Sequence, residues 1–499
     1  MGRTGKFIRN LLASGGLQVI MMISGFVVPK IMIDVYGSEV NGLVTSITML
    51  VGYVMLVEMG LGASLVYSLY KPLADADTAA INSILVASRN FYYKTGFLFL
   101  AIVAVVSAVY PMLVSCSAVS DIEICILFFL VAANGVLEFF TLAKYRALLT
   151  ADQKTYVAAV ATAVQVLTQM AIIAVFAYGG FSIVQVRVLV LFSLFLRSII
   201  LWGYCKVKYP FIDFSAKPNY GALSNRYDAF YFQMVGVVHN TAPILIVTFM
   251  MGFGDVSVYS VYNLVYMGVL ALLSVFITGL HAGFGDLLAR GEREKFKRAF
   301  NQFEFSYGIL IAVIYATMWI AYMPFMKVYI PHADINYQYP EIAALMTING
   351  IVYNLKTPYG MLTNAAGKFR ESRWQISIQA AIEIVCGIIF CYFWGINGVV
   401  CASILSNVYR DVDFVFFTPK HLTHFGFGYS LKIWARVFIC IALSILAFKA
   451  VPDFGSGGYA MWVLYTIAAF LASLAVALAV NILIDFDMFK NTLKRVKFI

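Results

Sequence analysis

The chain has 499 residues, of which 62% are hydrophobic and only 12% are charged, with a mean hydropathy of +0.85. Soluble domains carry about 25% charged residues, so the composition excludes a soluble protein and indicates a polytopic helical membrane protein. The net charge of +10 does not imply a nucleic-acid partner, because the basic residues follow a membrane topology.

Fourteen apolar stretches are long enough to cross a bilayer, for which about 20 residues suffice. The first is too long for the apolar part of a removable signal peptide and lacks a small-residue cleavage site. We therefore predict an all-α membrane protein with about fourteen transmembrane helices. They are expected in the ranges 11–34, 42–67, 95–114, 122–143, 155–178, 183–204, 229–251, 256–281, 305–330, 341–364, 374–394, 396–417, 433–450 and 459–484.

The first predicted span carries its own charge. Pro29 removes a backbone donor inside it, Lys30 follows at once, and Asp34 lies one turn further. A lysine in a spanning helix costs about 2.5–3.5 kcal/mol, so we expect the helix to be broken there and to line a water-filled path, as in transporters. In the alternative, Pro29 only kinks the helix and the Lys30 side chain extends outward from its end.

The distribution of basic residues predicts the topology. With the N-terminus inside, 28 of the 35 Lys and Arg residues fall in segments on the inner side, and only Lys327 and Lys449 fall outside. This asymmetry places both termini in the cytoplasm. The remaining five lie within or at the edges of spans: Lys30, Arg187, Arg197, Lys356 and Arg436.

Motifs for metal, disulfide or nucleotide chemistry are absent from the sequence. None of the seven cysteines forms a C-x-x-C pair, so neither a metal site nor a disulfide framework is expected. There is no P-loop and no H-E-x-x-H motif. We expect no catalytic residues, no metal and no cofactor.

Two short motifs recur along the chain. Gly-Leu elements begin at Gly60 and Gly279, and the segment Tyr145–Lys154 is followed by a similar one, Tyr359–Lys368, at nearly the same interval. This predicts two six-span halves, related by an axis along the membrane normal because six is an even number. The expected parts are an N-terminal lobe (1–205), a cytoplasmic linker (206–225), a C-terminal lobe (226–420), and two further spans with a basic tail (421–499).

Three segments resemble a known transporter family. Residues 36–43 resemble its G-x-x-x-(Y/N)-G-L turn after the first span, residues 58–62 resemble its acidic-x-G-L-G end of the second helix, and residues 145–157 resemble its fourth-to-fifth connection. The family is the polysaccharide-type flippases, the translocases of O-antigen and other lipid-linked oligosaccharides. They belong to the superfamily that also contains toxin-extrusion multidrug exporters and the peptidoglycan lipid flippase.

The resemblance implies a V-shaped pair of six-helix lobes and a flippase rather than an enzyme. Its expected substrate is a polyprenyl-pyrophosphate-linked oligosaccharide, moved by alternating access from the inner to the outer leaflet of the bacterial cytoplasmic membrane for cell-surface polysaccharide assembly. Expected partners are this lipid-linked saccharide, membrane lipids, and the polysaccharide polymerase and glycosyltransferases of the same pathway, with no nucleic acid.

An anionic pyrophosphate needs positive charge in a wet cavity, which lysine supplies as a point charge and arginine as a bidentate fork. The predicted cavity residues are Lys30, Arg197 and Lys356, with His239 and Asn240 of the seventh span beside Pro243. Each basic residue could instead pair internally with Glu58, Glu138 or Glu383.

Acidic residues within spans are candidates for coupling transport to a proton or a sodium ion. These are Glu58, Glu138 and Asp34. Serving as salt-bridge partners is the alternative role for them.

Two rival functions remain. A drug or cation antiporter of the toxin-extrusion type should have an acidic cavity, whereas the basic residues within the spans favour an anion. A membrane polysaccharide polymerase or ligase should carry a large external loop with Arg and His, but the longest expected external loop runs only from Tyr329 to Tyr339.

Overall fold

The computed structural model describes residues 3–55, 59–222, 227–278, 280–290, 292–368, 370–423 and 426–496, some of them by their backbone alone. All regular structure in these ranges is helical, which confirms the predicted fold class. The chain divides into two compact units, Met1–Ser260 and Val261–Ile499.

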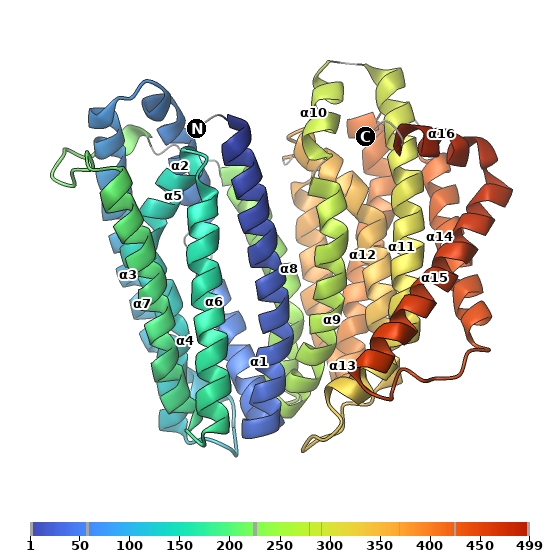
Figure 1. Ribbon diagram of the computed structural model, residues 1–499, viewed down its shortest axis with the longest axis horizontal. Helices are drawn as coiled ribbons and strands as arrows, with labels where there is room; N and C mark the ends of the chain where they lie inside the picture. The colour runs from blue at the N-terminus through green and yellow to red at the C-terminus, as the bar shows by residue number, and fades with distance from the viewer. Residues whose placement is uncertain are drawn as a thin grey trace. The chain divides into compact units, whose positions relative to one another are not determined.

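In the first unit, α1 lies along α6 (Figure 1). The core is formed by apolar side chains such as Leu43, Phe99 and Phe128, which are fully buried. The helices of this unit are α1 (Arg3–Val54), α2 (Met59–Ala74), α3 (Thr78–Leu113), α4 (Asp121–Leu137), the π-helical η2 (Glu138–Leu142), α5 (Ala143–Ala151), α6 (Thr155–Tyr178), α7 (Ile183–Lys208), η3 (Tyr220–Ala222), α8 (Tyr227–Met250) and the start of α9 (Phe253–Thr278).

In the second unit, α11 is the central helix and packs against α12, α14 and α15. Figure 1 shows α10 and α16 at the same end of this unit. Besides the rest of α9, its helices are α10 (His281–Ala289), α11 (Arg293–Tyr329), α12 (Pro340–Ala365), α13 (Arg373–Thr418), η4 (Pro419–Thr423), α14 (Gly428–Phe448), α15 (Tyr459–Ile484) and α16 (Phe486–Val496).

Among the described residues, ten helical stretches are long and apolar enough to cross a membrane. Two of them, α1 and α13, each join two helices across a kink, at Gly37 and Gly395. The helices α8 and α12 add two further apolar helices of 24 and 26 residues. Counted this way, the described helices give fourteen candidate spans, in agreement with the predicted number of about fourteen, and the chain is a multi-pass membrane protein.

The break in the first helix is not at its charged residue. The backbone stays helical through Pro29 and Lys30, and the non-helical residue is Gly37, with φ 85° and ψ 169°. Glycine adopts positive φ without a Cβ clash, whereas the donor that proline removes is one hydrogen bond that a membrane helix tolerates. The predicted break at Lys30 is therefore wrong, and the first span ends at the glycine.

Several positive φ angles recur at about the interval between the sequence motifs, while the division into two six-span halves stays a prediction. Positive φ angles occur at Gly37 and Gly252, and the same spacing separates a second such pair, Gly180 and Gly395. Glycine adopts such angles readily, so it is their spacing, and not their occurrence, that is informative. Gly279, one of the residues that predict the repeat, lies outside the described residues.

A third pair of positions supports the same period. Gln153 and Gly367 have φ angles of 57° and 64° and lie at the same place in the two matching segments that begin at Tyr145 and Tyr359. The following residue in each case, Lys154 or Lys368, donates its backbone N–H five residues back, at 2.7 Å and 3.0 Å respectively. Both turns therefore end a helix in the same way, although one uses a glycine and the other does not.

The helices α1 and α9 approach closely at a second glycine. A Cβ atom on Gly42 would lie 1.8 Å from the Phe253 carbonyl oxygen, and the neighbouring Asn41 side chain donates a 2.7 Å hydrogen bond to Ser257 Oγ. A side chain at Gly42 would push a backbone group, which cannot rotate away.

We predict that Gly42→Ala lowers the thermal unfolding temperature of the detergent-solubilised protein, because overpacking a tight contact costs about 1–3 kcal/mol. Gly52→Ala is the matched control on the same helix, where an added Cβ meets no atom of the described residues within 4 Å. Equal unfolding temperatures for the two variants would contradict the close contact.

The charge distribution predicts opposite sides for two connections. A reporter fused at Asp334, between α11 and α12, should give an external signal, and one fused at Glu292, between α10 and α11, a cytoplasmic signal. Signals from the same side would refute the predicted topology.

Candidate functional site

Lys356 lies on α12 inside the second unit and is 9% exposed. Its Nζ donates a 2.5 Å hydrogen bond to Asn407 Oδ1 of α13 and lies 4.9 Å from the centre of the Tyr353 ring. The residue is therefore held by an amide and an aromatic face. Both are weaker partners for a cation than a carboxylate in contact.

Amide side chains continue this network. Asn407 donates to Asn349 Oδ1 at 2.8 Å, and Gln379 Nε2 donates to Asn407 Oδ1 at 3.3 Å. Asn407 is 1% exposed, so its hydrogen bonds are made to protein groups. Such a network orients Lys356, because each amide is fixed by the next one.

Three buried charges on α13 act on Lys356: the carboxylates of Asp411 and Glu383, and the guanidinium of Arg410, which opposes them. Glu383 accepts a 2.5 Å hydrogen bond from Ser403 Oγ, while Asp411 Oδ1 is buried without a hydrogen-bond partner among the described residues. The lysine and these two acids therefore form an electrostatic cluster within α12 and α13 rather than a closed salt bridge.

The first unit contains a tighter ion cluster. Arg197 of α7 donates to Glu138 Oε2 at 3.1 Å and to Gln165 Oε1 of α6 at 3.2 Å. The second oxygen of Glu138 is 2.9 Å from the Arg146 guanidinium. The internal pairing that the sequence left open for Arg197 is thus present, and its role in a cavity stays a prediction.

The two clusters occupy corresponding positions with opposite charges. At the interval that separates Gln153 from Gly367, Arg197 corresponds to Asp411 and Gln165 to Gln379, while Lys356 lies one helical turn beyond the counterpart of Glu138. The cation of the first cluster, Arg197, lies on the sixth span of its half. The cation of the second cluster, Lys356, lies on the fourth span of its half. The sequence alone did not reveal this correspondence, because the paired residues are of different types.

Lys30 is paired along its own helix. Its Nζ lies 3.2 Å from Asp34 Oδ2, and the two side chains are 29% and 27% exposed. The structure does not test the roles predicted for His239, Asn240 and Glu58. His239 lies half-buried on α8, the side chain of Asn240 is not described, and Glu58 lies outside the described residues.

Sequence reasoning missed a buried acid, Glu304 of α11. The carboxylate is 4% exposed, accepts a 2.9 Å hydrogen bond from Ser430 and a short one from Tyr359, and within the described structure makes no ion pair with a basic side chain. Its position between Phe303 and Phe305, at the start of a predicted span, was the available signal.

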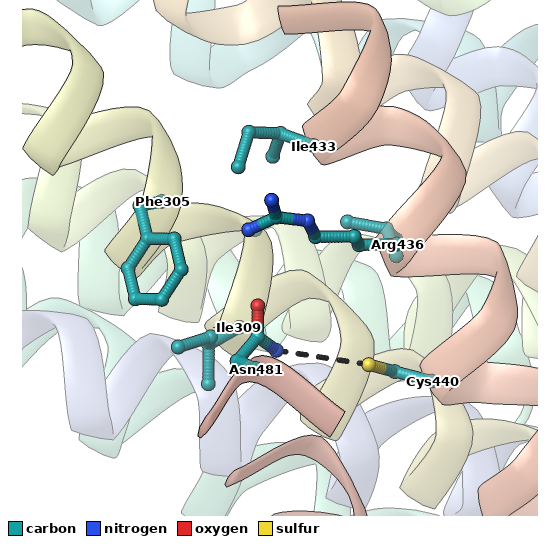
Figure 2. A pocket seen from close by; sticks show the side chains of 8 residues that line it. Phe305, Ile309, Ile433, Arg436, Cys440 and Asn481 are labelled. Atoms are coloured by element: carbon teal, nitrogen blue, oxygen red, sulfur yellow. Dashed lines mark hydrogen bonds between the residues drawn. The ribbon is translucent and has the colours of Figure 1, made fainter. Parts of the chain in front are cut away.

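Arg436 faces a small cavity between α11, α14 and α15 (Figure 2). Its guanidinium pairs with Asp485 at 3.2 Å, and Asn481 donates to Cys440 Sγ at 3.7 Å. The cavity measures about 10 Å³, which is room for about one water molecule. It is therefore a packing feature and not a substrate site.

No protein-family model and no curated protein matches this sequence. Several solved structures are similar to this chain. The inward closed lipid II flippase MurJ is 14% identical, with a TM-score of 0.69, and the match covers 96% of this chain and 100% of that one.

Multidrug exporters have the same fold. An inward-facing multidrug resistance MATE family transporter of the MOP superfamily is 15% identical, with a TM-score of 0.63, and the match covers 86% of this chain and 99% of that one. A MATE structure in complex with MaL6 is 13% identical, with a TM-score of 0.53, and the match covers 87% and 97%. The chain therefore has the fold shared by the MOP-superfamily transporters.

The ion cluster of the first unit generates a stability prediction. Glu138→Gln should destabilise the protein most, because it removes the carboxylate that both Arg197 and Arg146 contact, and breaking the buried Glu138–Arg197 pair costs about 3–5 kcal/mol. Arg197→Met should cost less, since Arg146 still neutralises Glu138. In a double-mutant cycle followed by thermal unfolding, the double variant should lose less than the sum of the single losses.

The control is Lys327→Met, which removes an exposed ion pair with Asp453 and should have little effect. Additive losses in the cycle would mean that Glu138 and Arg197 act independently, contrary to the observed contact.

Proposed function

We propose that the chain is a secondary transporter, and not an enzyme, that flips a polyprenyl-pyrophosphate-linked oligosaccharide across the bacterial cytoplasmic membrane. The fold supports a transporter, and the match to a lipid flippase covers 96% of this chain. The observation that carries the choice of an anionic lipid is Lys356, a cation inside a spanning helix whose hydrogen-bond acceptor is a neutral amide.

The chemistry of Lys356 suits reversible capture of a phosphate. A charged hydrogen bond to a phosphate oxygen is stronger than one to a neutral amide, so a pyrophosphate could replace Asn407 as the acceptor. Asp411 and Glu383 nearby would limit the affinity, and a flippase must release its substrate. We propose Lys30 as a second contact, with Asp34 as its partner in the absence of substrate.

A cation antiporter is the second candidate, and Glu304 is the observation that favours it. A buried carboxylate with two hydroxyl donors and no basic partner among the described residues is suited to bind a proton or a cation, because intramembrane acids commonly mark ion paths. The Glu304 carboxylate could instead couple lipid export to a proton or sodium gradient.

The partners in the flippase proposal are the polymerase and glycosyltransferases of a surface-polysaccharide pathway.

Lys30→Ala and Lys356→Ala should each reduce translocation of lipid-linked glycan at matched expression. A hydrogen bond to a charged group is worth about 1.5–3 kcal/mol, which corresponds to a loss of roughly tenfold or more. Lys→Arg at the same positions should retain measurable transport, because the charge is kept. Lys327→Ala, at the exposed end of α11, is the control.

Normal transport in both alanine variants would reject the role of these lysines. Loss of transport in the arginine as well as the alanine variants would assign them a structural role. Efflux of cationic dyes that is abolished by Glu304→Gln, without any glycan translocation, would establish the antiporter instead.

A further inference from the structure

Two cations converge on one aromatic ring at an end of the first unit. The Arg89 guanidinium of α3 lies 5.2 Å from the centre of the Phe214 ring, and Lys144 Nζ of α5 lies 5.0 Å from the same centre. Lys144 is also 5.2 Å from the Tyr145 ring. Each cation–π contact is favourable, but the two like charges act on each other.

Neither cation is neutralised by an acid in the described part of the chain. Arg89 Nε is buried without a hydrogen-bond partner, and its Nη2 reaches only Asn90 Oδ1, at 3.5 Å. Nearby Lys154 differs, since it pairs with Asp152 at 2.7 Å. Both side chains are half-buried, and like charges repel more there than in bulk water, so an anion bound beside them would relieve the repulsion.

The ring is held in place by the fold. Asn82 of α3 donates to the Phe211 carbonyl at 2.9 Å and accepts from the Asp213 amide at 3.2 Å. The backbone N–H of Asn219 donates to the Ser83 carbonyl at 3.1 Å. These bonds fasten the segment after α7 onto α3, and Figure 1 shows that segment at the end of the unit where α2 and α5 lie.

A hollow of about 310 Å³ lies beside this arrangement, because its wall includes Tyr145 and Phe214, the rings that the cations contact. Trp202, Lys206 and Ile212 also line it. Trp202 is 50% exposed, and Lys206 Nζ lies 4.9 Å from its ring. Aromatic residues beside lysines are typical of the membrane–water interface.

We propose that this hollow binds an anionic phospholipid, with the phosphate at its edge beside Arg89 and Lys144 and the glycerol region against Trp202 and Ile212. The apolar and aromatic wall favours a lipid over free phosphate, which would leave that wall unused. The predicted topology puts this end in the cytoplasm, where anionic lipids attract basic residues. The bound lipid joins α3, α5 and the segment after α7. This site does not depend on the transported substrate.

The test is thermal unfolding of the purified full chain in detergent with added phosphatidylglycerol, phosphatidylcholine or inorganic phosphate. Phosphatidylglycerol should raise the unfolding temperature by about 3 °C or more relative to phosphatidylcholine. The double variant Arg89→Gln/Lys144→Gln should lose this shift while unfolding no earlier than the wild type without lipid, because the repulsion is removed. Lys208→Gln, an exposed lysine at the end of α7, should keep the shift.

An equal shift in the double variant, or equal shifts with the two lipids, would overturn the site. A shift of the same size with inorganic phosphate would replace the lipid by free phosphate. Native mass spectrometry supplies an independent readout, in which phosphatidylglycerol should stay bound to the wild type and to Lys208→Gln but not to the double variant.

Discussion

The cost of placing charge inside membrane-spanning helices constrains this protein more than any other interaction. Every ionised group buried there needs partners within the protein, since the hydrocarbon offers none. The chain meets this requirement by a dense ion cluster around Glu138 in the first unit and by amides and distant acids around Lys356 in the second. We propose that the looser cluster, around Lys356, is the one that accepts the anionic group of the substrate.

The repeated backbone gives these clusters a common origin in the fold. The positive φ angles of Gln153 and Gly367 mark the repeat, and the polar residues Gln165 and Gln379 recur at the same interval. The charges at corresponding positions are opposite, since Arg197 of α7 lies where the second half has Asp411 of α13. If the two predicted halves share one architecture, this exchange of charge gives them different chemistry.

Much of the fold could be predicted from the sequence, because span length and apolar composition respond directly to bilayer thickness. The break in α1 could not, since Pro29 and Gly37 are both helix-weakening residues and only packing decides between them. Arg197 and Lys356 were found as charges within spans. Their partners Gln165, Asn407 and Asp411 were missed, because hydrogen-bond partners distant in the sequence leave no local pattern.

The most direct test is transfer of a lipid-linked saccharide across liposomes that contain only the purified chain. A polyprenyl-pyrophosphate lipid with a tagged sugar would be placed in both leaflets, and a membrane-impermeant reagent would then modify the tag. With an active flippase, the reagent should come to modify nearly all of the lipid, whereas protein-free liposomes should protect about half. Protection of the same half in the presence of folded protein, together with uptake of a cationic dye, would contradict this account.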